Sequence, residues 1–175
     1  PLCTKLFDRH DVEVSSKLSV MKMYAYSKAF YCAAVWPALN KQEQTIWHSG
    51  IIKLYRMAAG MRNDPQANEN HSSEKVIHAV QALVPDDLIK ESRLLYFRRL
   101  VIRGPKFLWA LLKAHFIASE TVKNAEPSWL HLVRRDIQWR CHNSPVDSRL
   151  PHHADVEAWS ETVAHAPFPW KRTVR

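Results

Sequence analysis

The segment "PDDLIKESRLLYFRRLVIRGP", residues 85–105, carries the pattern from which the fold is predicted. Pro85 suits the first position of a helix, and Asp86 and Asp87 suit its positively polarised N-terminus. Gly104 and Pro105 then interrupt the helix. We therefore predict one long helix that begins at Pro85 and ends near Ile102.

This predicted helix is apolar around most of its circumference, which is typical of a central, buried helix. One stripe, at seven-residue spacing, consists of Leu88, Leu95 and Ile102. Further apolar residues cover much of the rest of the circumference, and these are Ile89, Phe97, Leu100 and Val101. The polar strip is narrow and holds Ser92, Arg99 and Arg103. Two arginines one turn apart on such a strip are good candidates for rigidly held binding groups.

The segments before this helix also show helical patterns. Residues 14–36 predict a first helix that Pro37 ends. Residues 41–58 predict a second, capped by Gly60, whose inner face carries Trp47, Ile51, Leu54 and Ala58 at spacings of four, three and four. A polar loop at 61–73 follows, and then a short helix from Ser72 or Ser73 to about Leu83.

Three further helices are expected after Pro105. The first covers about 107–116; the second begins at Pro127 and Ser128, with one apolar face of Leu130, Val133 and Ile137; the third covers 155–163. Residues 143–153 and the C-terminal tail are expected to be irregular. With only 3 glycines in 175 residues, tight hairpin turns are few. We predict an all-α fold, an irregular bundle of about six to seven helices, with one region at 1–140 and an extension at 141–175.

Charge favours polyanionic partners. The chain has 25 Lys and Arg against 17 Asp and Glu, a formal charge of +8, so nucleic acid is the leading expectation. Arginines interleaved with aromatic residues can contact phosphates and stack on bases. The preferred pair is Arg99 and Arg103, and the remaining candidates are Arg93, Arg98 and Lys106 in the same stretch, and Arg134 and Arg135 in a second group.

Several catalytic chemistries lack a motif in this sequence. Asp86 and Asp87 fit the start of a helix better than a two-metal polymerase site. Cys141, His142, His152 and His153 lack zinc-finger spacing, and neither a phosphate-binding glycine loop nor a recognisable Ser or Cys nucleophile occurs. We expect no metal, no cofactor and no small-molecule substrate.

The cysteine count and the apolar runs bear on the compartment. Three scattered cysteines argue against a disulfide framework and fit a reducing compartment, the nucleus or cytoplasm. No apolar run approaches the ~18 residues of a membrane span, so no membrane partner is expected. The chain begins with Pro1, and we expect it to be a piece of a longer product.

The order of three segments resembles a known family. Phe30 to Trp36 ends one helix, Leu54 to Arg56 lies in the next, and Arg93 to Leu100 follows a variable spacer. This series, over roughly residues 25–135, resembles the segment that follows the palm in non-LTR (LINE-type) retrotransposon reverse transcriptases. The resemblance implies a helical thumb-and-linker region beside the template–primer duplex, without catalytic activity of its own.

The same resemblance implies the partners. They would be RNA or DNA and an upstream catalytic domain of the same polyprotein, since the family's catalytic aspartates lie upstream. Two alternatives remain open. One is a protein-interaction module that docks through Trp47, Ile51 and Leu54, and the other is an enzyme of unrecognised type.

Overall fold

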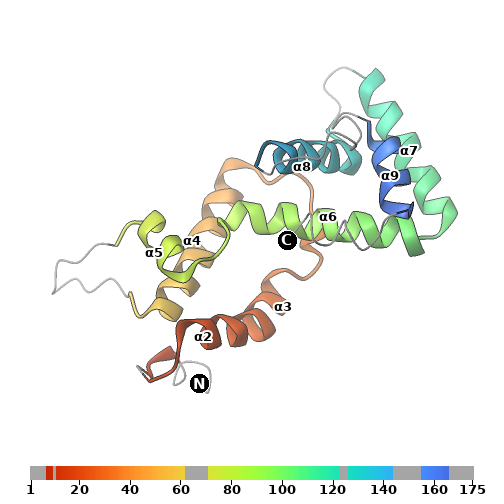
Figure 1. The fold of residues 1–175 in the computed structure, drawn as a ribbon. Helices are drawn as coiled ribbons and strands as arrows, with labels where there is room; N and C mark the ends of the chain where they lie inside the picture. The colour runs from red at the N-terminus through yellow and green to blue at the C-terminus, as the bar shows by residue number, and fades with distance from the viewer. Residues whose placement is uncertain (1–6, 10, 62–70, 123–125, 144–154, 166–175) are drawn as a thin grey trace. The chain divides into compact units, whose positions relative to one another are not determined.

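The computed structural model describes residues 7–9, 11–61, 71–122, 126–143 and 155–165. Within these ranges it contains helices and no strand (Figure 1). Seven helices have eight residues or more, so the prediction of an all-α fold with six to seven helices is confirmed. The predicted irregular residues 144–153, the tail and most of the 61–73 loop lie outside the described residues.

The chain forms two compact units. The first contains residues 1–31 and 39–88, and the second contains 32–38 and 89–175. The expected boundary at residue 140 therefore does not coincide with a division of the fold. The last described helix, predicted to belong to an extension, instead contributes to the core of the second unit.

The first unit contains α2 (Val14–Met21), a π-helical turn at Lys22–Tyr26, α3 (Ser27–Ala29), α4 (Lys41–Ala59) and α5 (Ser73–Val80). The predicted continuous helix over 14–36 is wrong. The chain stays helical through the π turn, α3 ends at Ala29, and Cys32 has a left-handed backbone with φ of 58°. Ala, Lys and Met favour a helix locally, but these propensities did not reveal the break.

Sequence reasoning placed α4 correctly, and local hydrogen bonds show why. The side chain of Asn40 accepts from the Glu43 backbone N–H, and the Glu43 carboxylate accepts from the Asn40 backbone N–H. This capping box satisfies two N–H groups that the helix leaves unpaired. At the other end Gly60 takes a φ of 70°, as predicted for the C-terminal cap.

The core of the first unit gathers on the inner face of α4. Ile51, Ile52, Tyr55 and Ala58 are buried there with other apolar residues, which are Phe7, Met21, Val76 and Val80. The Trp47 indole N–H donates to the Pro85 carbonyl at 2.9 Å. Trp47 and Leu54 pack against this core and Ile51 lies within it, so the stripe proposed for docking on another protein is part of the unit's own interior.

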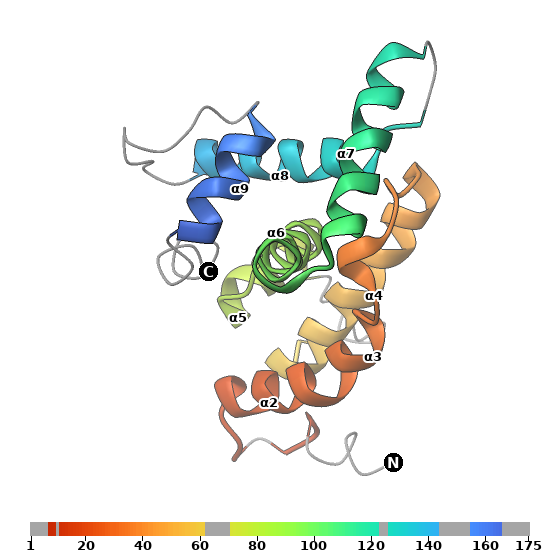
Figure 2. The ribbon, with the colours of Figure 1, turned by 90° about the vertical axis from the view of Figure 1, so that its right-hand side faces the viewer.

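The second unit contains most of α6 (Pro85–Arg103), then α7 (Lys106–Thr121), α8 (Trp129–Asn143) and α9 (Val156–His165). Pro85 and Ser128 open their helices and Gly104 follows α6, as the sequence predicted. A Cβ at Gly104 would lie 2.3 Å from the Leu100 carbonyl oxygen, so the bend there requires glycine. Figure 2 shows α9 lying next to α8 and crossing it.

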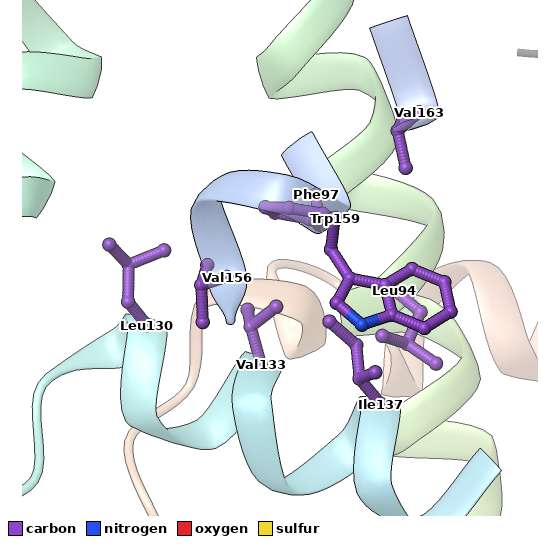
Figure 3. Close-up of a cluster of buried hydrophobic side chains, with 8 residues drawn as sticks. All are labelled: Leu94, Phe97, Leu130, Val133, Ile137, Val156, Trp159 and Val163. Atoms are coloured by element: carbon purple, nitrogen blue, oxygen red, sulfur yellow. The ribbon is translucent and has the colours of Figure 1, made fainter. Parts of the chain in front are cut away.

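The core of the second unit joins α6, α8 and α9. The indole of Trp159, from α9, lies among Leu94 of α6 and Ile137 of α8 (Figure 3). Leu130, Val133 and Ile137 form the predicted inner face of α8, and all three are buried. The backbone of residues 32–38 is tied to this unit, because the Trp129 indole N–H donates to the Ala34 carbonyl at 2.8 Å.

The buried face of α6 differs from the predicted stripe. Ile89, Arg93, Phe97 and Leu100 are buried, whereas Ile102 is 41% exposed. Leu88 and Leu95 are half-buried. The extent of apolar surface predicted a central, buried helix, but only part of its circumference is buried, and the stripe at seven-residue spacing lies outside that part.

Candidate nucleic-acid interface

The exposed basic residues of the second unit begin at the C-terminal end of α6. Arg99 and Arg103 share a face one turn apart, and Lys106 follows at the start of α7; all three are exposed. Among the residues that the structure describes, no carboxylate forms an ion pair with any of the three. Arg103 also lies in the last turn of α6, where the helix dipole favours a cation. These three side chains form the α6 basic cluster.

Arg93 does not belong to this cluster, which corrects its assignment as a binding residue. It is 5% exposed and pairs with Asp136 of α8 at 2.6 Å. A buried, paired guanidinium cannot reach a phosphate without breaking that pair. Arg98, another predicted candidate, is half-buried on α6.

The second predicted basic group, on α8, likewise contains one arginine that pairs with a carboxylate and one that is exposed. Arg134 is half-buried, pairs with Glu120 of α7 at 3.2 Å, and lies 5.3 Å from the centre of the Phe116 ring. Arg135 is exposed. Both line a cavity of about 280 Å³, together with Pro127, His131, Leu132 and Gln138. Arg135 is therefore the α8 candidate best placed to meet a ligand.

The aromatic residues near these arginines are mostly used for packing. Phe97 is fully buried, and Tyr96 meets Trp129 edge to face at 5.9 Å. The ring of Trp139 is covered by the Lys90 ammonium at 4.7 Å. Phe107 alone among the aromatic residues noted beside the arginines is strongly exposed, at 74%, and it directly follows Lys106.

His131 was not singled out from the sequence, yet it organises the junction of α7 and α8. The Ser128 hydroxyl lies 2.8 Å from its Nδ1, and its Nε2 lies 3.6 Å from Glu120. Its ring stacks obliquely on Phe116 with centroids 4.3 Å apart. Burial lowers the pKa of His131, nearby Arg134 lowers it further, and Glu120 opposes the shift. A serine three residues before the histidine at a helix start was the available signal.

Ser128, His131 and Glu120 superficially match the groups of a hydrolytic triad. Ser128 is 1% exposed at the start of α8, however, and a nucleophile must be able to reach its substrate. The three residues instead join the helix start to α7. In the described ranges, no group of three or more His, Cys, Asp or Glu side chains is placed to hold a metal ion; His152 and His153 lie outside those ranges.

None of the described helices combines the length and the apolar character that crossing a bilayer requires. Comparison of the chain with protein-family models, curated proteins and solved structures gave no significant match.

Proposed function

We propose that this chain binds the phosphate backbone of RNA or DNA through its second unit, with the α6 basic cluster as the principal contact. The observation that carries the proposal is the exposure of Arg99, Arg103 and Lys106 without carboxylate partners among the described residues. Residues four apart in a helix rise about 6 Å along its axis. Two guanidinium groups at that spacing can each grip a phosphate through paired hydrogen bonds.

The contact is mainly electrostatic. Lysine and arginine displace condensed counterions when they meet phosphates, so binding weakens steeply as salt is raised. Arg135 supplements the cluster on α8, and the net charge of +8 supports attraction over a longer range. Since phosphates occur at every nucleotide, the proposed contact grips nucleic acid without reading its sequence.

The resemblance to the post-palm region of non-LTR retrotransposon reverse transcriptases supports a specific use of this grip. The chain would hold template and primer while an upstream catalytic domain of the same polyprotein performs the polymerisation. Charge and exposure in the second unit support the binding step. The role in reverse transcription depends on the order of the sequence segments.

Fluorescence anisotropy tests the binding step. The 175-residue chain is titrated into labelled duplex DNA, single-stranded DNA and RNA of equal length, in a series of salt concentrations. We expect binding at low ionic strength that falls linearly in log K against log salt. A folded chain that binds none of the three oligonucleotides at low salt would refute the proposal.

A further inference from the structure

The cavity on α8 is lined mainly by side chains that can donate hydrogen bonds to an anion. Its volume is about 280 Å³, near the lower end of the range for small-molecule sites. Its apolar lining consists of Pro127 and Leu132, and its polar lining consists of His131, Arg134, Arg135 and Gln138. We call this cavity the α8 pocket.

Arg135 and Gln138 supply the donors of the α8 pocket that no protein group uses. Both side chains are exposed, and they lie three residues apart on the same side of α8. Among the described residues, neither side chain forms a hydrogen bond or an ion pair. The guanidinium of Arg135 and the amide of Gln138 are therefore available to a ligand.

Arg134 brings a second positive charge to the α8 pocket. Its Nη1 donates to the Glu120 carboxylate at 3.2 Å, and its guanidinium carbon lies 5.3 Å from the centre of the Phe116 ring. A guanidinium has five N–H donors, so this one contact leaves others for a ligand. Glu120 does not line the pocket. The lining therefore holds two arginine charges and no carboxylate, which favours an anionic ligand.

The size of the α8 pocket and its donors select a terminal phosphate over an internal one. A phosphate between two nucleosides carries one negative charge and is flanked by sugars on both sides, whereas a terminal phosphate protrudes from the strand. A terminal phosphate also carries about two negative charges and three free oxygens at neutral pH. Two arginines and an amide can donate to these oxygens at the same time. We therefore propose that the α8 pocket binds the terminal phosphate of a nucleic-acid strand.

This inference rests on the proposed function, because it takes nucleic acid as the ligand, and it adds recognition of a strand end. The α6 basic cluster contacts phosphates anywhere along a strand, so its contribution to binding does not depend on the chemistry of the ends. The α8 pocket is filled only by an end that carries a phosphate. We expect the chain to bind a phosphorylated strand more tightly than the same strand with hydroxyl ends.

Fluorescence anisotropy of the full chain with a short single-stranded DNA tests this preference. The strand is labelled internally and carries a 5′-phosphate, a 3′-phosphate, or hydroxyl groups at both ends. We expect a phosphorylated form to bind about tenfold more tightly than the hydroxyl form, which is the contribution of one hydrogen bond to a charged group. Equal binding of all three forms overturns the strand-end assignment and leaves the α6 basic cluster in place. Binding of none of them at low salt refutes the proposed function as well.

The double variant R135A/Q138A tests whether the α8 pocket is the source of the preference. Both residues are exposed, so the fold should be retained. The matched control is Q42A/K53A, which removes one amide and one positive charge from exposed positions on α4 of the first unit. The ratio of the two affinities, phosphorylated over hydroxyl, is the readout, because a general loss of positive charge weakens both forms alike.

We expect this ratio to fall from about ten to about one in R135A/Q138A and to keep its wild-type value in the control. The variant R99A/R103A should bind both forms more weakly at an unchanged ratio, since it alters only the α6 basic cluster. A folded R135A/Q138A variant that retains the wild-type ratio overturns the assignment of the α8 pocket.

Discussion

Arg93 and Asp136 form a buried ion pair of 2.6 Å, although they lie 43 residues apart. Their side chains are only 6% and 2% exposed, and the pair joins α6 to α8 inside the second unit. Burial raises the pKa of Asp136, while Arg93 opposes that shift. Two ionised groups withdrawn from water in this way depend on each other, and loss of either leaves a buried charge uncompensated.

Removing one partner of this pair should therefore destabilise the chain strongly. Asp136→Asn and Arg93→Met are each expected to lower the free energy of unfolding by about 3–5 kcal/mol, as for other broken buried pairs. The double variant R93M/D136L replaces both charges with apolar groups and should recover much of the loss. Urea denaturation measures all three. Near-wild-type stability of the R93M variant would mean that the pair is not buried as described.

Stability should fall as the pH is lowered through the range in which His131 titrates. Its pKa in the folded chain is lowered by burial, so the unfolded chain takes up the proton first. The contribution of the neutral His131 ring to the free energy of unfolding is fully present above the unfolded pKa of about 6.5. It is lost as the pH falls through the lower pKa of the folded chain. The position of His131 near the start of α8 adds to the effect, because a helix N-terminus disfavours a cation.

Thermal unfolding between pH 5 and 8 measures this dependence. His131→Gln keeps a polar side chain that does not titrate, and the decrease in midpoint temperature with falling pH should be shallower than in the wild type. His48→Gln, on α4 of the first unit, is the control for removing a histidine elsewhere. Equal pH dependence in the H131Q variant and the wild type would contradict the pKa direction.

Replacement by alanine should change the stability of the chain in opposite directions at Gly50, which lies inside α4, and at Gly60, which directly follows it. Gly50 lies inside the helix, is exposed, and has no atom within 4 Å of an added Cβ, so Gly50→Ala should stabilise the chain by about 1 kcal/mol. Gly60 has a φ of 70°, so Gly60→Ala should destabilise it by about 1–2 kcal/mol. Chemical denaturation compares the two, and a shift of the same sign in both variants would contradict the helix end at Ala59.

Helix positions were predictable where a terminal signal and an apolar face agreed. Asn40 to Gly60 and Ser128 to Ile137 are such cases, and Pro85 and Gly104 marked the limits of α6. The end of the first helix at Ala29 was not predictable, because residues 14–36 contain no proline or glycine and the left-handed backbone falls on Cys32. Sequence reasoning expected α6 to be buried around most of its circumference and did not distinguish the side that is buried, which includes the charged Arg93.

The sequence indicated which basic residues are candidates for the site, but not which of them are exposed and which are paired. Sequence reasoning preferred Arg99 and Arg103, and both side chains are exposed as a phosphate contact requires. It could not separate them from Arg93 or Arg134, because the partners of these two, Asp136 and Glu120, lie on other helices. Which arginine is available to a ligand depends on tertiary pairing that local sequence does not encode.

The salt dependence of nucleic-acid binding by the double variant R99A/R103A shows whether the α6 basic cluster contacts phosphates. Anisotropy titrations with duplex DNA give log K against log salt, and loss of two phosphate contacts should make the slope shallower by about 2. The matched control is K41A/K53A, which removes the same charge from exposed positions on α4. We predict a shallower slope for R99A/R103A and a wild-type slope for the control; a wild-type slope for a folded R99A/R103A variant would contradict the assignment of the α6 basic cluster.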